Sequence, residues 1–147
     1  SADASPDFIE RIIELYGLIH ARYLRSSIGL EKYHDIYVTT GFFPCPRVLC
    51  GGISCLPYGR SDEAREFDLA MLCPNCYEVY ETPEMPIRID GAFFGSTWAH
   101  LFLMRYNDVI PRNPPQRYIP RVYGFQIIDQ SNAEEYSYSE SDSNSFR

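Results

Sequence analysis

The chain has 147 residues, a length that fits one domain or two small modules sharing a core. With 45% hydrophobic and 22% charged residues, its composition is that of a folded protein rather than a disordered one. The formal net charge of −7 argues against general binding to a nucleic-acid backbone, which requires a basic surface.

The start of the sequence, SADASPD, is polar and acidic and does not resemble a signal peptide. No apolar run approaches the ~20 residues that a membrane-spanning helix needs. We therefore expect an intracellular protein. In a reducing compartment disulfides are rare, and paired cysteines are more often metal ligands.

The first predicted element is a helix over residues 5–24, where apolar residues recur every three or four positions. Ser5 suits the N-cap and Pro6 the first helical position. Gly17 lies in mid-helix, where either a close backbone contact or ordinary tolerance would explain it. The stripe of apolar side chains comprises Phe8, Ile12, Leu15, Ile19 and Tyr23.

Further along, we expect a second helix over residues 29–37 and a third from about Ser96. Between them, residues 41–80 are punctuated by Gly, Pro and Cys, which indicates short strands and tight turns around a metal. A proline-rich connector leads to a strand-like segment, RYIPRVYGFQII, residues 117–128. The serine-rich acidic end, residues 129–147, is predicted to be a disordered tail. The fold class is therefore α+β.

Two cysteine pairs carry the strongest chemical signal. Cys45 and Cys50 enclose four residues, and Cys73 and Cys76 enclose two. The second pair alone would also suit a redox enzyme, but two pairs together favour one Zn²⁺ bound by four thiolates. Such a site has no open position for water, so we expect a structural metal. Cys55 is left over, either as a small buried hydrophobe or as a redox-sensitive thiol.

Other catalytic chemistry is not apparent in the sequence. The histidines at 20, 34 and 100 are scattered, with no nucleophile motif beside them, and His20 suits packing better than proton transfer. There is no phosphate-cradling glycine loop and no paired-carboxylate motif, and Asp90-Gly91 suits a turn. We predict that the protein is not an enzyme.

Six ordered motifs resemble one known family. They are YGLIHARY (16–23), FFPCPRVLC (42–50), LPYG (56–59), CPNC (73–76), DGAFFG (90–95) and PRVYGF (120–125). Together they resemble the regulatory beta subunit of casein kinase II over about residues 6–127. The resemblance implies a non-catalytic protein of the cytoplasm and nucleus that dimerises through its zinc ribbon. It also implies that two such chains bind two catalytic kinase subunits and modulate their stability and substrate choice.

The resemblance implies a division into a partial helical domain (1–40), a zinc-ribbon domain with a docking segment (41–128) and the tail (129–147). The family's dimer surface corresponds to Pro46, Val48, Leu49, Val79 and Tyr80. Kinase docking is expected at Tyr123 and Phe125, with Arg121 as a donor at the rim. In an extended strand, residues i and i+2 project from the same face, which would pair the two aromatic rings.

The sequence also departs from the family. It begins midway through the family's helical domain, so N-terminal self-phosphorylation and polyamine sensitivity cannot be carried over from the resemblance. ETPEMPIR, residues 81–88, replaces a basic stretch, and the return strand expected beyond Ile128 is replaced by the acidic tail. Two alternatives therefore stay open. One is a homologue that dimerises but no longer docks the kinase. The other is a zinc-ribbon nucleic-acid binder using arginines 105, 112, 117 and 121.

Three tail serines, Ser131, Ser137 and Ser139, each precede an acidic residue by three positions. This is the pattern that casein kinase II prefers, so the sequence predicts phosphorylation of the tail by that kinase. A tail that only aids solubility is the alternative.

Overall fold

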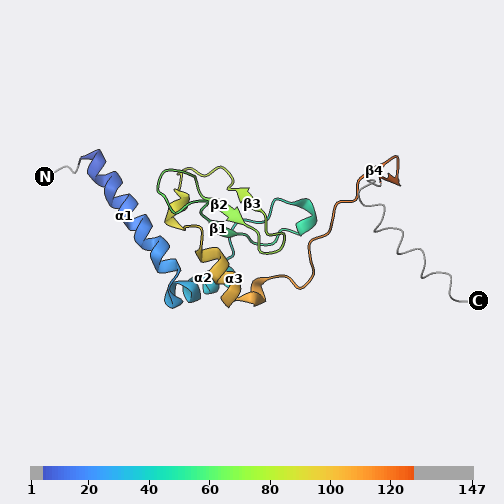
Figure 1. Ribbon diagram of the computed structural model, residues 1–147, viewed down its shortest axis with the longest axis horizontal. Helices are drawn as coiled ribbons and strands as arrows, with labels where there is room; N and C mark the ends of the chain where they lie inside the picture. The colour runs from blue at the N-terminus through green and yellow to red at the C-terminus, as the bar shows by residue number, and fades with distance from the viewer. Residues whose placement is uncertain (1–4, 128–147) are drawn as a thin grey trace, which may run out of the picture. The chain divides into compact units, whose positions relative to one another are not determined.

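The computed structural model describes residues 5–127, and the chain divides into two units between Gln116 and Arg117. The first unit contains the helices α1 (Pro6–Leu24), α2 (Ser27–Thr39) and α3 (Trp98–Arg105) and the strands β1 (Leu56–Tyr58), β2 (Ala70–Leu72) and β3 (Val79–Glu81) (Figure 1). The second unit contains β4 (Arg121–Val122) and β5 (Phe125–Gln126). In the described part of the chain, no helix combines the length and apolarity needed to cross a membrane.

The α+β class is confirmed, and local hydrogen bonds explain where the helices begin. Ser5 is the N-cap of α1 by position, although its side chain makes no capping bond. Helix α2 is longer than predicted because the Ser26 hydroxyl caps it, accepting a hydrogen bond from the Gly29 N–H at 3.1 Å. Helix α3 starts two residues later than predicted. Ser96 is held outside it, since its N–H and hydroxyl both donate to Asp62.

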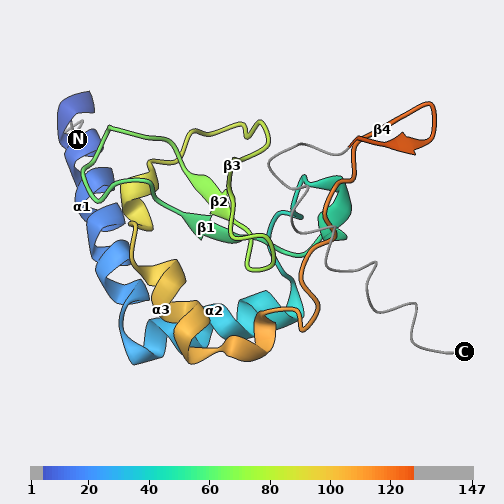
Figure 2. The same cartoon turned by 45° about the vertical axis from the view of Figure 1, so that its right-hand side comes forward.

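The first three strands form an antiparallel sheet in the order β1-β2-β3, and successive residues of the central strand face opposite sides. Leu72 belongs to one buried cluster and Met71 to another. The first cluster, here called the helix-side core, combines Leu24 and Leu30 of the helical segment with residues of β1, β2 and α3. Figure 2 shows α2 and α3 beside each other on this side of the sheet.

Trp98 is the centre of the helix-side core. Its side chain is fully buried, and its indole N–H donates to the Pro57 carbonyl at 3.0 Å, so its polar atom is satisfied. Tyr33 of α2 and Phe102 of α3 pack on the indole with ring centroids 5.3 and 5.7 Å away. The division between helical and ribbon domains at residue 40 stays a prediction, and one cluster includes residues from both sides of it.

Helix α1 contacts the rest of the unit through a small part of its surface. Gly17 and Leu24 are its buried residues, and a side chain at Gly17 would overlap the Phe93 ring. A close contact, rather than ordinary tolerance, therefore explains this glycine. The apolar stripe seen in the sequence is exposed to between 41% and 60% in the described chain: Phe8, Ile12, Leu15, Ile19 and Tyr23.

The second unit is a β-hairpin, and it corrects one expectation. Val122 pairs with Phe125, and the two residues between them form the turn, with φ of 50° at Tyr123 and 84° at Gly124. Two left-handed residues in a two-residue loop define a type I′ turn. Tyr123 and Phe125 are thus on the turn and on the returning strand, so the prediction that both project from one extended strand is wrong.

The predicted tail of residues 129–147, with its three candidate phosphorylation sites, lies outside the described residues.

Candidate metal centre

Two short loops present the predicted ligands, and backbone hydrogen bonds fix each loop. In the first, the N–H groups of Cys45 and Cys55 donate to the carbonyls of Ile53 and Phe43, both at 2.8 Å. A single 3-10 turn over Val48–Cys50 closes this loop. In the second, the Cys73 N–H donates to the Glu78 carbonyl at 3.1 Å. Both loops are thereby held with their cysteines on the inside.

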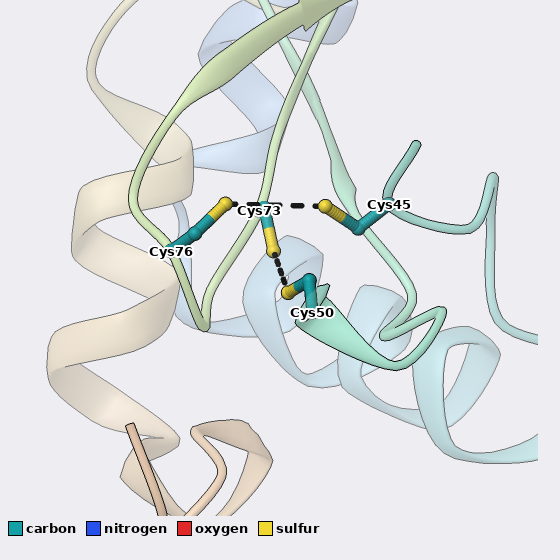
Figure 3. A group of neighbouring side chains, drawn as sticks. All are labelled: Cys45, Cys50, Cys73 and Cys76. Atoms are coloured by element: carbon teal, nitrogen blue, oxygen red, sulfur yellow. Dashed lines mark hydrogen bonds between the residues drawn. The ribbon is translucent and has the colours of Figure 1, made fainter. Parts of the chain in front are cut away.

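The four sulfur atoms converge from these loops (Figure 3). All lie within 4.8 Å of one another, and the sulfurs of Cys45 and Cys76 are 3.9 Å apart. Those of Cys50 and Cys73 are 3.5 Å apart. A tetrahedral zinc–thiolate site with bonds of about 2.3 Å has sulfur–sulfur edges of about 3.8 Å. This cysteine cluster (Cys45, Cys50, Cys73 and Cys76) therefore has the dimensions of a tetrahedral metal site.

Burial and hydrogen bonding act in opposite directions on the thiols. Burial raises the pKa of Cys45 and of Cys73. Burial also acts to raise the pKa of Cys76, but hydrogen bonds from the Tyr80 hydroxyl and the Glu78 backbone outweigh it and lower that pKa to about 7. Four cysteine sulfurs form a donor set that suits a soft divalent ion. Cysteines bind such an ion as thiolates, so their protons leave when the ion binds.

Cys55 lies beside the cluster but is not one of its four members. Its side chain is 1% exposed, and burial raises its pKa to about 12. The prediction of a small buried hydrophobe is confirmed. A redox-sensitive thiol would need access and thiolate character, and neither is present here.

Two polar side chains around the cluster were not predicted as part of the metal site, and one of them, Tyr80, was expected at the dimer surface instead. The Asn75 amide lies 3.2 Å from the Cys50 sulfur, and the Tyr80 hydroxyl lies 3.1 Å from the Cys76 sulfur. Asn75 lies within the CPNC motif, so its position between two predicted ligands was a signal in the sequence that it lies beside the metal site. Tyr80 follows Cys76 by four residues in β3, and only the fold of the second loop brings it back to the sulfur.

The residues predicted for dimerisation surround the same two loops. Val48 is 92% exposed at the tip of the first loop, and Pro46 beside it is also exposed. Leu49 is half-buried. Val79 and Tyr80 are consecutive strand residues, with Val79 facing outward and Tyr80 packed against the cysteines. Their role in an interface stays a prediction.

The predicted docking residues all belong to the hairpin unit. Tyr123 is 97% exposed and Phe125 is 80% exposed. The Arg121 guanidinium donates to the Gly124 carbonyl at 3.2 Å, so within the hairpin it supports the turn. Their role in binding a kinase also stays a prediction.

His20 is a packed histidine, as predicted. Its two ring nitrogens lie 2.7 Å from the Phe93 carbonyl and 2.9 Å from the Tyr33 hydroxyl, so both are engaged in structure. Of the four arginines considered for nucleic-acid binding, Arg105 bonds the Tyr106 hydroxyl and Arg121 bonds its own hairpin.

The fold and the site define a small α+β protein organised around a cluster of four cysteines. The family described as casein kinase II regulatory subunit matches residues 1–126. The chain is 41% identical to casein kinase II subunit beta-3 of Arabidopsis thaliana over 127 residues, which cover 85% of the chain and 46% of that protein. It is 42% identical to casein kinase II subunit beta of Dictyostelium discoideum over 114 residues, covering 77% and 42% of the two proteins.

A third relative, casein kinase II subunit beta of Schizosaccharomyces pombe, is 43% identical over 119 residues, covering 80% of the chain and 51% of that protein. The chain thus belongs to the casein kinase II regulatory subunit family. It spans about half the length of the curated relatives it matches.

Proposed function

We propose that the chain acts as a non-catalytic regulatory subunit of casein kinase II. In this role it holds one structural Zn²⁺, dimerises through its ribbon and docks catalytic subunits, modulating their stability and substrate choice. The observation that carries the proposal is the convergence of four cysteine sulfurs to within 4.8 Å in a chain of this family.

Zinc is the metal that the donor set favours. Four sulfurs and no oxygen select a soft ion, and tetrahedral geometry without an open position suits zinc in a structural role. When bound, the ion would tie the two cysteine loops together. The strands beside them are three residues long, so they have little sheet of their own to hold the loops in place.

Dimerisation is proposed at the ribbon because apolar side chains are uncovered there. Val48 at 92% and Val79 at 37% exposure flank the cysteine loops. A twofold axis would place the same patch of both chains together and cover it.

Docking of the catalytic subunit is proposed at the hairpin. Its apolar side chains have little core to enter within a unit of two short strands, and Tyr123 and Phe125 are almost fully exposed. Large aromatic residues are the kind of anchor that dominates protein interfaces. We also propose an intracellular location, in cytoplasm and nucleus. The cluster of four cysteines supports this location, because paired cysteines in a reducing compartment are more often metal ligands than disulfides.

The test is a binding titration with a purified casein kinase II catalytic subunit, preceded by elemental analysis and light scattering. We expect one zinc per chain, a dimer at micromolar concentration and complex formation. A zinc-containing dimer that does not bind the catalytic subunit would instead support a homologue that has lost docking. Salt-dependent retention on heparin would support the nucleic-acid alternative.

A further inference from the structure

The cysteine cluster creates an electrostatic problem for this chain. A divalent ion bound by four thiolates carries a net charge of about −2, and the whole chain already carries −7. The negative charge that remains on the metal-bound sulfurs is stabilised by hydrogen bonds from nearby donors. The side chains that approach the sulfurs therefore matter for how firmly the metal is held.

Tyr80 approaches one of these sulfurs from β3. Its hydroxyl oxygen lies 3.1 Å from the Cys76 sulfur, a distance suited to an O–H···S hydrogen bond. A metal-bound thiolate has no proton, so in the loaded site the tyrosine must be the donor. The alternation of side chains along β3 places the Tyr80 side chain on the side of the cluster, while its neighbours Val79 and Glu81 are exposed.

Asn75 approaches a second sulfur and connects the two loops. Its side-chain nitrogen lies 3.2 Å from the Cys50 sulfur and 3.5 Å from the Cys50 carbonyl oxygen. Both are acceptors, so only the NH₂ end of the amide can face them. Its own backbone N–H lies 3.4 Å from the Cys73 sulfur. One residue of the second loop thus donates to a ligand of each loop.

We propose that Tyr80 and Asn75 are positioning residues of the metal centre, which donate hydrogen bonds to the thiolates of Cys76 and Cys50 and so retain the metal. This inference rests on the proposed zinc site. It also gives the two residues of the predicted dimer surface in β3 different roles. The Tyr80 hydroxyl is directed at the Cys76 sulfur, whereas Val79 faces outward.

The experiment measures the transfer of zinc from the full chain to a chromogenic chelator. Tyr80→Phe removes only the hydroxyl. Loss of such an outer-shell partner typically lowers metal affinity about 10–100-fold, so we expect transfer to become about tenfold faster. Tyr77→Phe is the matched control. It also removes a tyrosine hydroxyl beside Cys76, but that hydroxyl reaches no sulfur in the described chain, and its ring is 59% exposed. Transfer from this control should match the unaltered protein.

For Asn75, the comparison is between Asn75→Asp and Asn75→Ala. Aspartate has the same size but replaces a donor by a negative charge, so it should release zinc faster than the alanine variant. If Asn75 only filled space, Asn75→Asp would be the milder of the two changes, and that order would overturn its assignment.

Binding of Co²⁺ alone supplies a spectroscopic readout of the thiolates themselves. Loss of a hydrogen bond raises the energy of the sulfur lone pairs, so the sulfur-to-cobalt charge-transfer band of Tyr80→Phe should move to longer wavelength. An unaltered chain that binds neither Zn²⁺ nor Co²⁺ would overturn the proposed metal site together with this inference. A chain that binds both, but in which Tyr80→Phe behaves like Tyr77→Phe, would overturn the role of Tyr80 alone.

Discussion

Replacing Tyr123 by asparagine tests the proposed docking hairpin without damaging it. Tyr123 and Gly124 both have positive φ, the conformation of a type I′ turn, for which Asn-Gly is a favoured pair. Asparagine tolerates this left-handed backbone better than most residues. The exchange therefore removes the aromatic ring while keeping, or strengthening, the turn.

The size of the expected effect follows from exposure. The Tyr123 side chain is 97% exposed, so its removal loses almost no contact within the free chain. An aromatic side chain buries about 150–250 Å² in an interface, which at about 25 cal/mol per Å² sets an upper bound of about 4–6 kcal/mol. Measured anchors of this kind cost about 2 kcal/mol or more, which corresponds to about thirtyfold weaker binding.

Isothermal titration calorimetry of the zinc-loaded chain with a casein kinase II catalytic subunit measures this effect. Phe125→Ala should weaken binding by a similar factor. Tyr118→Asn is the matched control, since Tyr118 is 75% exposed in the same unit but lies outside the turn. Zinc content and dimer mass should not change. Equal affinities for Tyr123→Asn, Tyr118→Asn and the unaltered chain would refute the assignment of docking to the turn.

Further outcomes are expected at the metal site, at the ribbon surface, in helix α1 and in the tail. Cys45→Ser should abolish zinc binding in elemental analysis and unfold the ribbon, because structural zinc contributes on the order of 10 kcal/mol to such modules. Cys55→Ser, outside the cluster, should keep its zinc; a loss there would show that the four ligands are wrongly assigned. Val48→Glu should halve the mass seen by light scattering without affecting the fold, since Val48 is 92% exposed, and an unaltered chain that is already monomeric would disprove the interface. Gly17→Ala should lower the free energy of unfolding in urea by about 1–3 kcal/mol, because its methyl group meets the Phe93 ring. At an open helical site the same change would stabilise by about 1 kcal/mol, and such a gain would contradict the packing. Mass spectrometry after incubation with the holoenzyme and ATP should find phosphate on the three tail serines, and an unmodified tail would rule this out.

The sequence predicted the cysteine cluster correctly because the spacing within each pair sets the shape of a tight loop. It could not predict Asn75 and Tyr80 as donors, since the Asn75 bond to Cys50 joins residues 25 positions apart and depends on how the two loops meet. The turn at Tyr123 was missed for a different reason. Tyrosine is not a usual turn residue, so Tyr-Gly did not carry the signal that Asn-Gly or Asp-Gly would have carried. For α1, periodicity identified an apolar stripe but could not say whether anything covers it.

The helix-side core has a consequence for how this protein can be divided. Leu24 and Leu30 pack with Leu56, Leu72 and Trp98, so residues on both sides of position 40 fill the same interior. A fragment beginning at residue 41 would keep all four cysteines yet leave the indole of Trp98 without the Tyr33 ring that covers it. The ribbon is therefore not an independently folding domain. Chimaeras that exchange it between relatives should preserve their folding only when the two helices before it are exchanged as well.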